Sequence, residues 1–518
     1  MSGNRPITPS FYEASGPAPG SVLTAGPAAE TTGAGPGPLR IKLVAFNPER
    51  FSLALGSLDA ILSERFGTTV AVDQLIYDID DLRFRRLDPA LPIAEIMRDT
   101  PHVVGLSWYT WNHGFMQHVA RSVSQRMPGT TLVVGGPETR TVFENDLTAL
   151  PDGTILVFGE GEQTMCEIIE RIQKDGGVLD LPPGTGRVTG GAIERSERIS
   201  TPLPLDQLPS PLLTGHLKDP PSTRMPSYAT TRGCIYRCSF CAWQDGMSER
   251  QFPLDRVFEE LDALAAKAYD MIWFTDTIFG RDESRGLAII ERLRKWPPNT
   301  HFGFELHAQF LTPRLADGVA SLPLDFAAIG VQSLAPDVLK ATKRSPKTTK
   351  LTDALDLLYE RFPEKRKLHI DLIFGLPEQT LADCLHGVDV LLTRYPEATL
   401  YCSVLQLIPG TAFEYLRQRP GWVTQPHDGD FEVVETPTLT GADFERIRDL
   451  LVGLELLSVA RDAADPKLRL TAEQAESIGW QLRGTRFYLC PTGFRHETIP
   501  WSEVGEDAQQ ALLSVATA

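Results

Sequence analysis

Residues 231–241 read TRGCIYRCSFC and contain three of the seven cysteines of the chain, Cys234, Cys238 and Cys241. They directly follow a strand-like run at 227–230. Three thiolates spaced CxxxCxxC on one loop can bind three irons of a [4Fe–4S] cluster and leave the fourth iron open, whereas a ferredoxin normally supplies four cysteines. Zinc would need a second ligand pair, which the sequence lacks, and chance clustering is the other alternative. The spacing therefore predicts an iron–sulfur cluster with one iron available to an outside ligand.

The same loop resembles the cysteine motif of the radical S-adenosylmethionine (radical SAM) superfamily, including the aromatic Phe240 before the third cysteine. This resemblance implies that the amino and carboxylate groups of S-adenosylmethionine chelate the open iron. It also implies that one electron from the cluster cleaves this cofactor to a 5′-deoxyadenosyl radical. An electron donor such as flavodoxin or ferredoxin is then an expected partner.

Length, charge and cysteine usage limit the architecture and the partners. A chain of 518 residues suggests roughly three domains, and 42% hydrophobic residues permit a large buried core. The net charge of −17 provides no basic surface for nucleic acid. An odd number of cysteines, three of them in one loop, argues against a disulfide framework and for a reducing compartment. Without a membrane-length apolar run or a signal-peptide pattern, we expect a soluble, cytoplasmic protein that does not bind membranes.

The N-terminal half predicts a tail followed by an α/β domain. Residues 1–38 are rich in Pro, Gly, Ala, Ser and Thr, which predicts disorder. From Arg40 onward, short apolar runs alternate with helical patterns, which is typical of a doubly wound parallel sheet. We expect a Rossmann-like domain over 39–195 and a linker over 196–225. Ligands of such sheets bind at the carboxyl ends of the strands.

Three of these strand ends are rich in glycine and aromatic residues: SWYTWN at 107–112, GGPE at 135–138 and GEGE at 159–162. Glycine lets the backbone approach a ligand closely, and the Trp and Tyr rings offer flat apolar surfaces. Together the segments resemble the cobalamin-binding domain that precedes the radical SAM domain in one large subgroup, although a domain that has lost the cofactor is the alternative. The cobalamin contacts that the resemblance implies are Ser107, Trp108, Tyr109, Trp111, Gly135, Gly136, Pro137, Glu138, Glu160 and Gly161.

The sequence lacks the DxHxxG motif with which many cobalamin proteins ligate cobalt from below. His113 and His118 lie nearby, but five residues apart on a predicted helix they do not share a face. We expect a cobalt without a histidine lower ligand, with Trp108, Tyr109 or Trp111 near that face. Such a cobalt should give up a methyl group to a radical more readily.

After Cys241 the alternation of strands and helices resumes. Together with the strand before the cysteines it predicts six βα units over 226–430, as in the partial (β/α)₆ TIM-type barrel of radical SAM enzymes, with active residues at the carboxyl ends of the strands. The S-adenosylmethionine contacts that the resemblance implies are Phe240, Asp276, Glu305, Gln332, Ser333 and Gly375. Asp371 fits a functional and a buried structural acid equally well.

Other strand-end residues are candidates for a substrate pocket, namely His307, Tyr401 and Cys402, although Cys402 is more simply a small buried hydrophobe. From residue 431 the pattern becomes helical, with amphipathic stretches at 439–460, capped near Thr440, and at 472–482. This predicts a small, mostly helical C-terminal domain over 431–518 with an aromatic tail that could cap the substrate.

Taken together, these features imply a cobalamin-dependent radical SAM methyltransferase. Its expected target is an unactivated carbon of a secondary-metabolite intermediate, as in antibiotic biosynthesis: an aromatic heterocycle, an amino acid or a peptide. Rearrangement, ring contraction or cyclisation without methyl transfer is one alternative. A non-catalytic scaffold that binds the cofactors is the other, and the intact cysteine loop argues against it.

Overall fold

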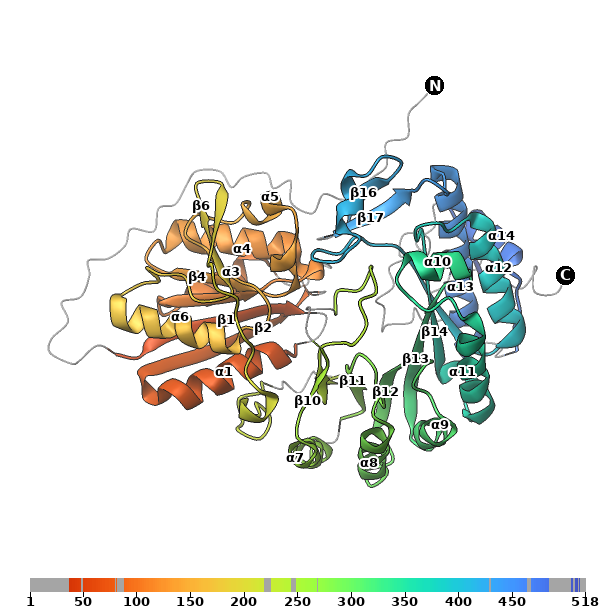
Figure 1. Cartoon of the computed structure of the whole chain (residues 1–518), viewed down its shortest axis with the longest axis horizontal. Helices are drawn as coiled ribbons and strands as arrows, with labels where there is room; N and C mark the ends of the chain where they lie inside the picture. The colour runs from red at the N-terminus through yellow and green to blue at the C-terminus, as the bar shows by residue number, and fades with distance from the viewer. Residues whose placement is uncertain are drawn as a thin grey trace.

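The computed structural model describes two α/β units that lie side by side (Figure 1). The described residues are 37–47, 50–79, 81, 88–218, 225–243, 248–267, 269–427, 430–463, 467–483, 505, 508–510 and 512. The predicted N-terminal tail lies almost entirely outside these residues, as does the aromatic C-terminal tail beyond Trp480. No helix among the described residues is long and apolar enough to span a membrane.

The first unit is built on a seven-stranded sheet in the order β2-β1-β3-β4-β5-β6-β7. Its first five strands are parallel: β1 (Leu39–Asn47), β2 (Val70–Asp78), β3 (Val103–Ser107), β4 (Thr131–Gly135) and β5 (Ile155–Val157). An antiparallel hairpin of β6 (Thr185–Thr189) and β7 (Ala192–Arg195) extends one edge. The helices are α1 (Leu53–Phe66), α3 (Ala90–Met97), α4 (His113–Arg126), α5 (Glu144–Leu147) and α6 (Glu162–Asp175).

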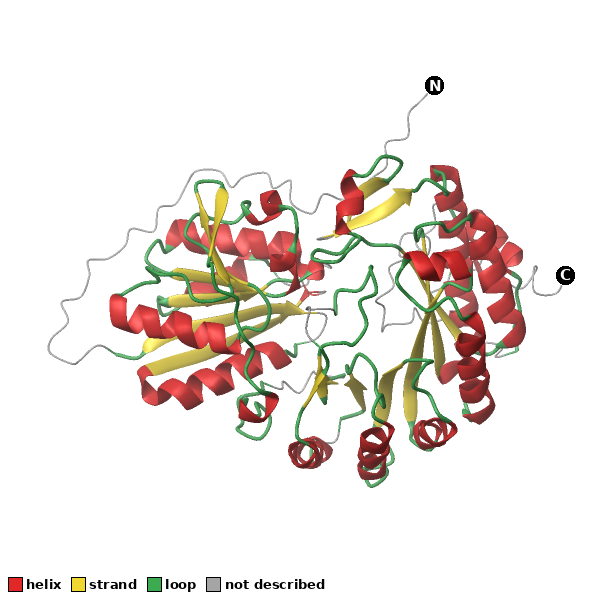
Figure 2. Ribbon diagram, viewed as in Figure 1, coloured by secondary structure: helices red, strands yellow, loops and turns green. Residues whose placement is uncertain are grey.

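Helices cover both faces of this sheet, as Figure 2 shows. Successive residues of β1 enter two different cores because side chains alternate along a strand. Leu43 and Ala45 pack with residues of α1 and α6, whereas Val44 and Phe46 pack with residues of α3 and α4. The doubly wound sheet predicted from the sequence is therefore confirmed.

The second unit is a six-stranded parallel sheet in the order β15-β14-β13-β12-β11-β8. Its strands are β8 (Ser227–Tyr228), β11 (Met271–Phe274), β12 (His301–Leu306), β13 (Leu324–Gln332), β14 (Leu368–Phe374) and β15 (Thr399–Val404). Its helices are α7 (Leu254–Ala265), α8 (Glu283–Leu293), α9 (Pro313–Ala320), α10 (Pro336–Ala341), α11 (Thr348–Arg361) and α12 (Leu381–Arg394). The first and last strands, β8 and β15, are the two edges of the sheet, so the barrel is open, as expected.

The C-terminal elements are a hairpin of β16 (Val423–His427) and β17 (Asp430–Glu435), followed by α13 (Gly441–Ala463) and α14 (Ala472–Gln481). The sequence analysis did not anticipate the hairpin, which stands between the two units in Figure 1. Thr440 does cap α13: its hydroxyl accepts from the Asp443 amide, and the Asp443 carboxylate accepts from the Thr440 amide.

Two glycines let α13 and α14 cross in direct backbone contact. A Cβ atom at Gly453 would lie 2.0 Å from the Ala475 carbonyl oxygen, and one at Gly479 would lie 1.8 Å from the Asp449 carbonyl oxygen. A Cβ atom at either distance would clash with the backbone of the other helix, so only glycine permits this crossing. The pair then packs against α12 and β15 on the outside of the barrel.

Candidate functional site

A buried carboxylate binds the start of the cysteine loop. Asp276, two residues after β11, is 1% exposed and accepts hydrogen bonds from the amide and hydroxyl groups of both Thr230 and Thr231, at 2.6–2.9 Å. Burial raises the pKa of Asp276, and these four hydrogen bonds oppose the rise. Asp276 was predicted to bind S-adenosylmethionine, but its oxygens are engaged in holding the start of the loop in place.

The three cysteines lie close enough to affect one another electrostatically. Cys238 is buried, whereas Cys234 and Cys241 are half-buried. Burial raises the pKa of the Cys241 thiol to about 11, and the other two thiols add to this effect. Binding to iron would displace the protons, because a metal binds the thiolate.

The three cysteines supply the donor set that the predicted cluster needs. Three thiolates can each bind a different iron of a [4Fe–4S] cluster and leave the fourth iron open. The residues present therefore fit the predicted [4Fe–4S] cluster.

Aromatic stacking ties the loop to the barrel. The Tyr236 ring stacks on His307 at the end of β12, and its hydroxyl donates to Gln309 Oε1 at 2.6 Å. Burial, and then the positive charge of Arg344, lower the pKa of His307 to about 4, so its imidazole is neutral near pH 7. Phe240 is half-buried and packs against the main core.

Two carboxyl groups lie in the barrel interior, on strands β12 and β14, which flank β13. Burial, reinforced by the charge of Asp371, raises the pKa of Glu305 on β12 to about 8. Burial also raises the pKa of Asp371 on β14 to about 6, and Arg344 opposes that rise. One protonated and one ionised carboxyl group would offer both a donor and an acceptor to a zwitterionic cofactor and its ribose. The contact predicted for Glu305 remains a prediction.

Arg344 is a site residue that the sequence analysis missed. It follows α10, and its Nη1 lies 3.6 Å from Cys238 Sγ while its Nη2 donates to the Gly330 carbonyl. The neighbouring Lys343 has a φ of 59°, in the left-handed region. No local signal marks Arg344, because it lies 106 positions from Cys238 in sequence and only the fold brings them together.

The other predicted S-adenosylmethionine contacts lie at the ends of β13 and β14. Gln332 and Ser333 are buried, and the Gln332 amide lies over Gly330 beside Arg344. Gly375 has a φ of 90°, and a Cβ there would lie 2.9 Å from the Phe444 ring of α13. Glycine at 375 is therefore explained by packing. On β15, Tyr401 and Cys402 are half-buried, and burial raises the pKa of the Cys402 thiol.

In the first unit, the predicted aromatic residues separate into a core residue and a stacked pair. Trp108 is 1% exposed and belongs to the core behind the edge of the sheet. Tyr109 and Trp111 stack at 4.3 Å with 13° between their rings, and Trp111 Nε1 donates to the Phe46 carbonyl. Burial raises the pKa of Tyr109. This half-buried pair fits the flat face of a corrin ring, whereas the buried Trp108 ring does not.

Neither histidine near this edge is placed as a metal ligand. His113 Nδ1 lies 2.7 Å from Glu138 Oε2, its Nε2 lies 3.0 Å from Gln117 Nε2, and His118 is on the exposed side of α4. Glu138, predicted to contact cobalamin, is 2% exposed and holds His113. Likewise Gly136, with a φ of 114°, allows close approach of Trp108, whose carbonyl oxygen would lie 2.4 Å from a Cβ.

The third predicted segment, GEGE, faces the cysteine loop across the two units. Glu160 binds Arg232 and Arg250, and Glu162 binds Arg232. The remaining predicted cobalamin contacts are half-buried at the carboxyl edge of the sheet: Ser107, Gly135, Pro137 and Gly161. The structure thus brings together the two edges that the sequence assigned to the two cofactors.

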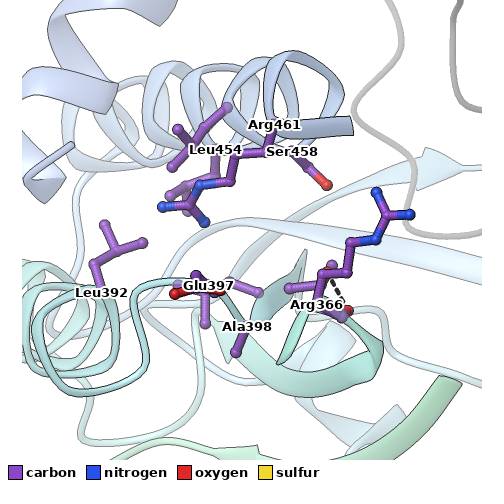
Figure 3. Close-up of a pocket in the computed structure, with 10 residues that line it drawn as sticks. Arg366, Leu392, Glu397, Ala398, Leu454, Ser458 and Arg461 are labelled. Carbon is purple, nitrogen blue, oxygen red and sulfur yellow. Dashed lines mark hydrogen bonds between the residues drawn. The ribbon is translucent and has the colours of Figure 1, made fainter. Parts of the chain in front are cut away.

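A cavity of about 20 Å³ at the other end of the barrel is not part of this site (Figure 3). It lies between α13 and the start of β15, and the guanidinium of Arg461 lies against it near Glu397. Burial, and then Arg469, lower the pKa of Arg461 to about 10. The space holds about one water molecule, and the amino-terminal face of such a barrel serves stability.

Comparison with known proteins assigns both units. Residues 228–389 match the radical SAM superfamily and residues 69–169 match the B12 binding domain. The two matches confirm the predicted cofactors: a [4Fe–4S] cluster, S-adenosylmethionine and cobalamin.

Two curated relatives are methyltransferases. One is the 2-(S-pantetheinyl)-carbapenam-3-carboxylate methyltransferase of Streptantibioticus cattleyicolor, 29% identical over 312 residues. The other is the cobalamin-dependent radical SAM methyltransferase TokK of Streptomyces tokunonensis, 27% identical over 330 residues. The alignments cover 56% and 60% of this chain, but only 45% and 47% of the relatives.

Two solved structures share the fold. TsrM from Kitasatospora setae, with cobalamin and a [4Fe–4S] cluster bound, has a TM-score of 0.59 at 19% identity, over 78% of this chain and 79% of TsrM. OxsB with aqua-cobalamin and S-adenosylmethionine has a TM-score of 0.64 at 15% identity, over 93% of this chain and 78% of OxsB. At these identities the likeness establishes the arrangement of the domains and not the substrate.

Proposed function

We propose that this chain is a cobalamin-dependent radical SAM enzyme that methylates an unactivated carbon of a small natural-product intermediate. The observation that carries the proposal is the contact between the two cofactor edges, where Arg232 of the cysteine loop binds Glu160 of the B12-binding unit. A substrate held there would face both cofactors at once. The methyltransferase relatives support transfer of a methyl group over rearrangement.

When bound, the cluster and S-adenosylmethionine supply a 5′-deoxyadenosyl radical, and cobalamin supplies the methyl group. Cys234, Cys238 and Cys241 would hold the cluster, and Asp276 fixes the loop that carries them. The stacked Tyr109 and Trp111 would lie against the corrin.

The remaining site residues would bind and orient S-adenosylmethionine and the substrate. Glu305 and Asp371 provide a donor and an acceptor in the barrel interior, and Arg344 compensates negative charge next to Cys238. His307, neutral near pH 7, would line the substrate side of the pocket without adding charge. Cys402 instead pairs with Leu372 in the strand register and packs against the core. A flavodoxin or ferredoxin is the proposed source of the electron.

The substrate class is taken from the relatives. One relative is named for its action on a carbapenam carboxylate, and a structure of TsrM contains tryptophan as substrate. Both are small molecules with a ring and a carboxylate. We therefore assign this chain a ring-containing carboxylic acid intermediate of antibiotic biosynthesis.

The test is anaerobic incubation of the reconstituted full chain with S-adenosylmethionine, a reductant and candidate substrates. 2-(S-pantetheinyl)-carbapenam-3-carboxylate and tryptophan are the first probes. We expect 5′-deoxyadenosine, S-adenosylhomocysteine and a product heavier by one CH₂ group. A product of unchanged mass, formed together with 5′-deoxyadenosine, would indicate the rearrangement class instead, and absence of both nucleosides would overturn the enzyme assignment.

A pair of cysteine variants provides the matched control. Cys238→Ala removes a cluster ligand and should abolish 5′-deoxyadenosine formation. Cys384→Ala changes a buried thiol of α12 outside the site and should leave it unchanged.

A further inference from the structure

Arg232 connects the cysteine loop to the B12-binding unit. It lies two positions before Cys234, on β9 (Thr231–Arg232), which pairs with β10 (Arg250–Gln251). Its Nη1 is 3.0 Å from Glu160 Oε2 and its Nη2 is 2.8 Å from Glu162 Oε1. Arg250 on β10 also binds Glu160. One planar guanidinium thus bridges two carboxylates of another domain, and this fork geometry restricts distance and direction together.

The network is partly shielded from water, so its charges interact strongly. The side chains of Arg232, Glu160 and Glu162 are 23%, 16% and 9% exposed. Burial acts to raise the pKa of Glu162, but the charge and hydrogen bond of Arg232, a backbone hydrogen bond and the charge of Arg250 together hold this pKa below the usual value. In addition, Glu162 is the first residue of α6, where the helix dipole favours a carboxylate.

A second contact holds the other end of the cysteine loop. Arg140 of the B12-binding unit donates to the Ala242 carbonyl, next to Cys241, at 2.6 Å. Nearby, Glu414 is fully buried and accepts hydrogen bonds from Thr141 Oγ1 and from the Val142 amide, the latter at 3.0 Å. The B12-binding unit therefore holds the loop both before its first cysteine and after its last.

We propose that Arg232 is a positioning residue: together with Glu160 and Glu162 it sets the placement of the cluster loop relative to the cobalamin edge. This inference rests on the proposed function, because it presupposes both cofactors. It also assigns Glu160 to the junction between the domains rather than to cobalamin. The contacts of Arg140 and Glu414 keep the two units together when Arg232 is lost, so its loss loosens the alignment without separating them.

Alignment matters because the substrate carbon must face the radical source first and the methyl donor next. A misplacement of about 1 Å can lower a rate on the order of 10²-fold. Formation of 5′-deoxyadenosine requires only the barrel, whereas methyl transfer requires both units. Loss of the Arg232 bridge should therefore uncouple the two events.

The test compares Arg232→Met with wild type in the full, reconstituted chain. We expect the variant to have unchanged iron and cobalamin content and to form 5′-deoxyadenosine at a rate within about twofold of wild type. The amount of methylated product per 5′-deoxyadenosine should fall by about tenfold or more. Arg232→Lys keeps the charge but cannot reproduce the planar fork, and should be intermediate. Arg292→Met removes an exposed ion pair with Asp262 on the outer helices of the barrel and is the control.

Two further readouts do not depend on turnover. Pulsed electron paramagnetic resonance measures the distribution of distances between the reduced cluster and cob(II)alamin through their magnetic interaction. This distribution should broaden in Arg232→Met and not in Arg292→Met. In the cofactor-free protein, hydrogen exchange should increase at 158–162 and 231–241 together. Glu162→Gln leaves the loop sequence intact and should reproduce both effects, which covers the case in which Arg232→Met fails to assemble its cluster.

Unchanged product yield per 5′-deoxyadenosine and unchanged magnetic interaction in both Arg232→Met and Glu162→Gln would overturn the proposal. A wild-type protein that forms neither 5′-deoxyadenosine nor S-adenosylhomocysteine would instead contradict the proposed function. The hydrogen-exchange comparison would still test the junction in that case.

Discussion

Glu138 holds His113 by a contact of 2.7 Å between Oε2 and Nδ1, inside the unit that matches the B12 binding domain. Because the Gln117 amide nitrogen can only donate, Nε2 is its acceptor at 3.0 Å, and the imidazole proton is then on Nδ1, which faces Glu138. Both ring nitrogens are engaged. The imidazole is thus a structural part of the domain and is not presented to a metal.

From this relationship we predict that the cob(II)alamin form of the protein shows no histidine nitrogen splitting in its electron paramagnetic resonance spectrum. His113→Ala should leave the cobalt signal unchanged while lowering the free energy of unfolding by about 1–3 kcal/mol, because buried Glu138 loses its hydrogen bond with His113. Splitting that changes on ¹⁵N-histidine labelling would contradict the prediction.

Arg344 should tune the cluster through its charge next to Cys238. We predict that Arg344→Met lowers the reduction potential of the cluster, because loss of a nearby cation disfavours the added electron. Arg344→Lys keeps the positive charge, so its cluster should have a reduction potential close to that of wild type. Arg292→Met, on the outer surface, should leave the reduction potential unchanged. Potentiometric titration followed by electron paramagnetic resonance measures this. Equal potentials in wild type and Arg344→Met would refute the electrostatic role.

Glu305 should make the stability of the cofactor-free protein depend on pH. Its pKa is about 8 in the folded chain against 4.5 for the ordinary group, so the unfolded chain releases this proton first as the pH rises. The stabilising contribution is therefore complete below about pH 4.5 and is lost progressively up to about pH 8. The free energy of unfolding of wild type should therefore decline between pH 5 and pH 8. We predict that Glu305→Gln makes this decline smaller by on the order of 3 kcal/mol.

Urea unfolding at a series of pH values measures this effect. Glu291→Gln, an exposed carboxylate of α8, is the control and should leave the slope unchanged. A wild-type slope that Glu305→Gln does not alter would show that Glu305 is ionised throughout.

Two glycine variants test the crossing of α13 and α14. Gly479→Ala places a methyl group against the Asp449 carbonyl and should destabilise the protein by about 1–3 kcal/mol. Gly387→Ala, in α12, meets nothing within 4 Å and should be neutral or stabilising by about 0.5–1 kcal/mol. Thermal unfolding followed by circular dichroism compares them, and equal melting temperatures would mean that the helices can separate without cost.

The sequence alone predicted the features that depend on short-range spacing. Cys234, Cys238 and Cys241 lie within eight consecutive positions, so their chemistry is local. The Thr440 cap is also a local interaction, since its partner Asp443 is three residues away. Alternation of apolar residues over longer stretches sufficed to predict the parallel strands of both sheets, because each strand must bury its side chains whatever its neighbours are.

Only the tertiary structure decided which strand-end side chains are engaged in contacts within the protein. Trp108, Glu138 and Asp276 lie in segments that the sequence assigned to ligands, yet each is engaged within its own domain. Conversely, no sequence motif marks Arg344 or the ion pair between Arg232 and Glu160. Their contacts span 106 and 72 positions, and the direction of a side chain at such a contact depends on packing that no local pattern encodes.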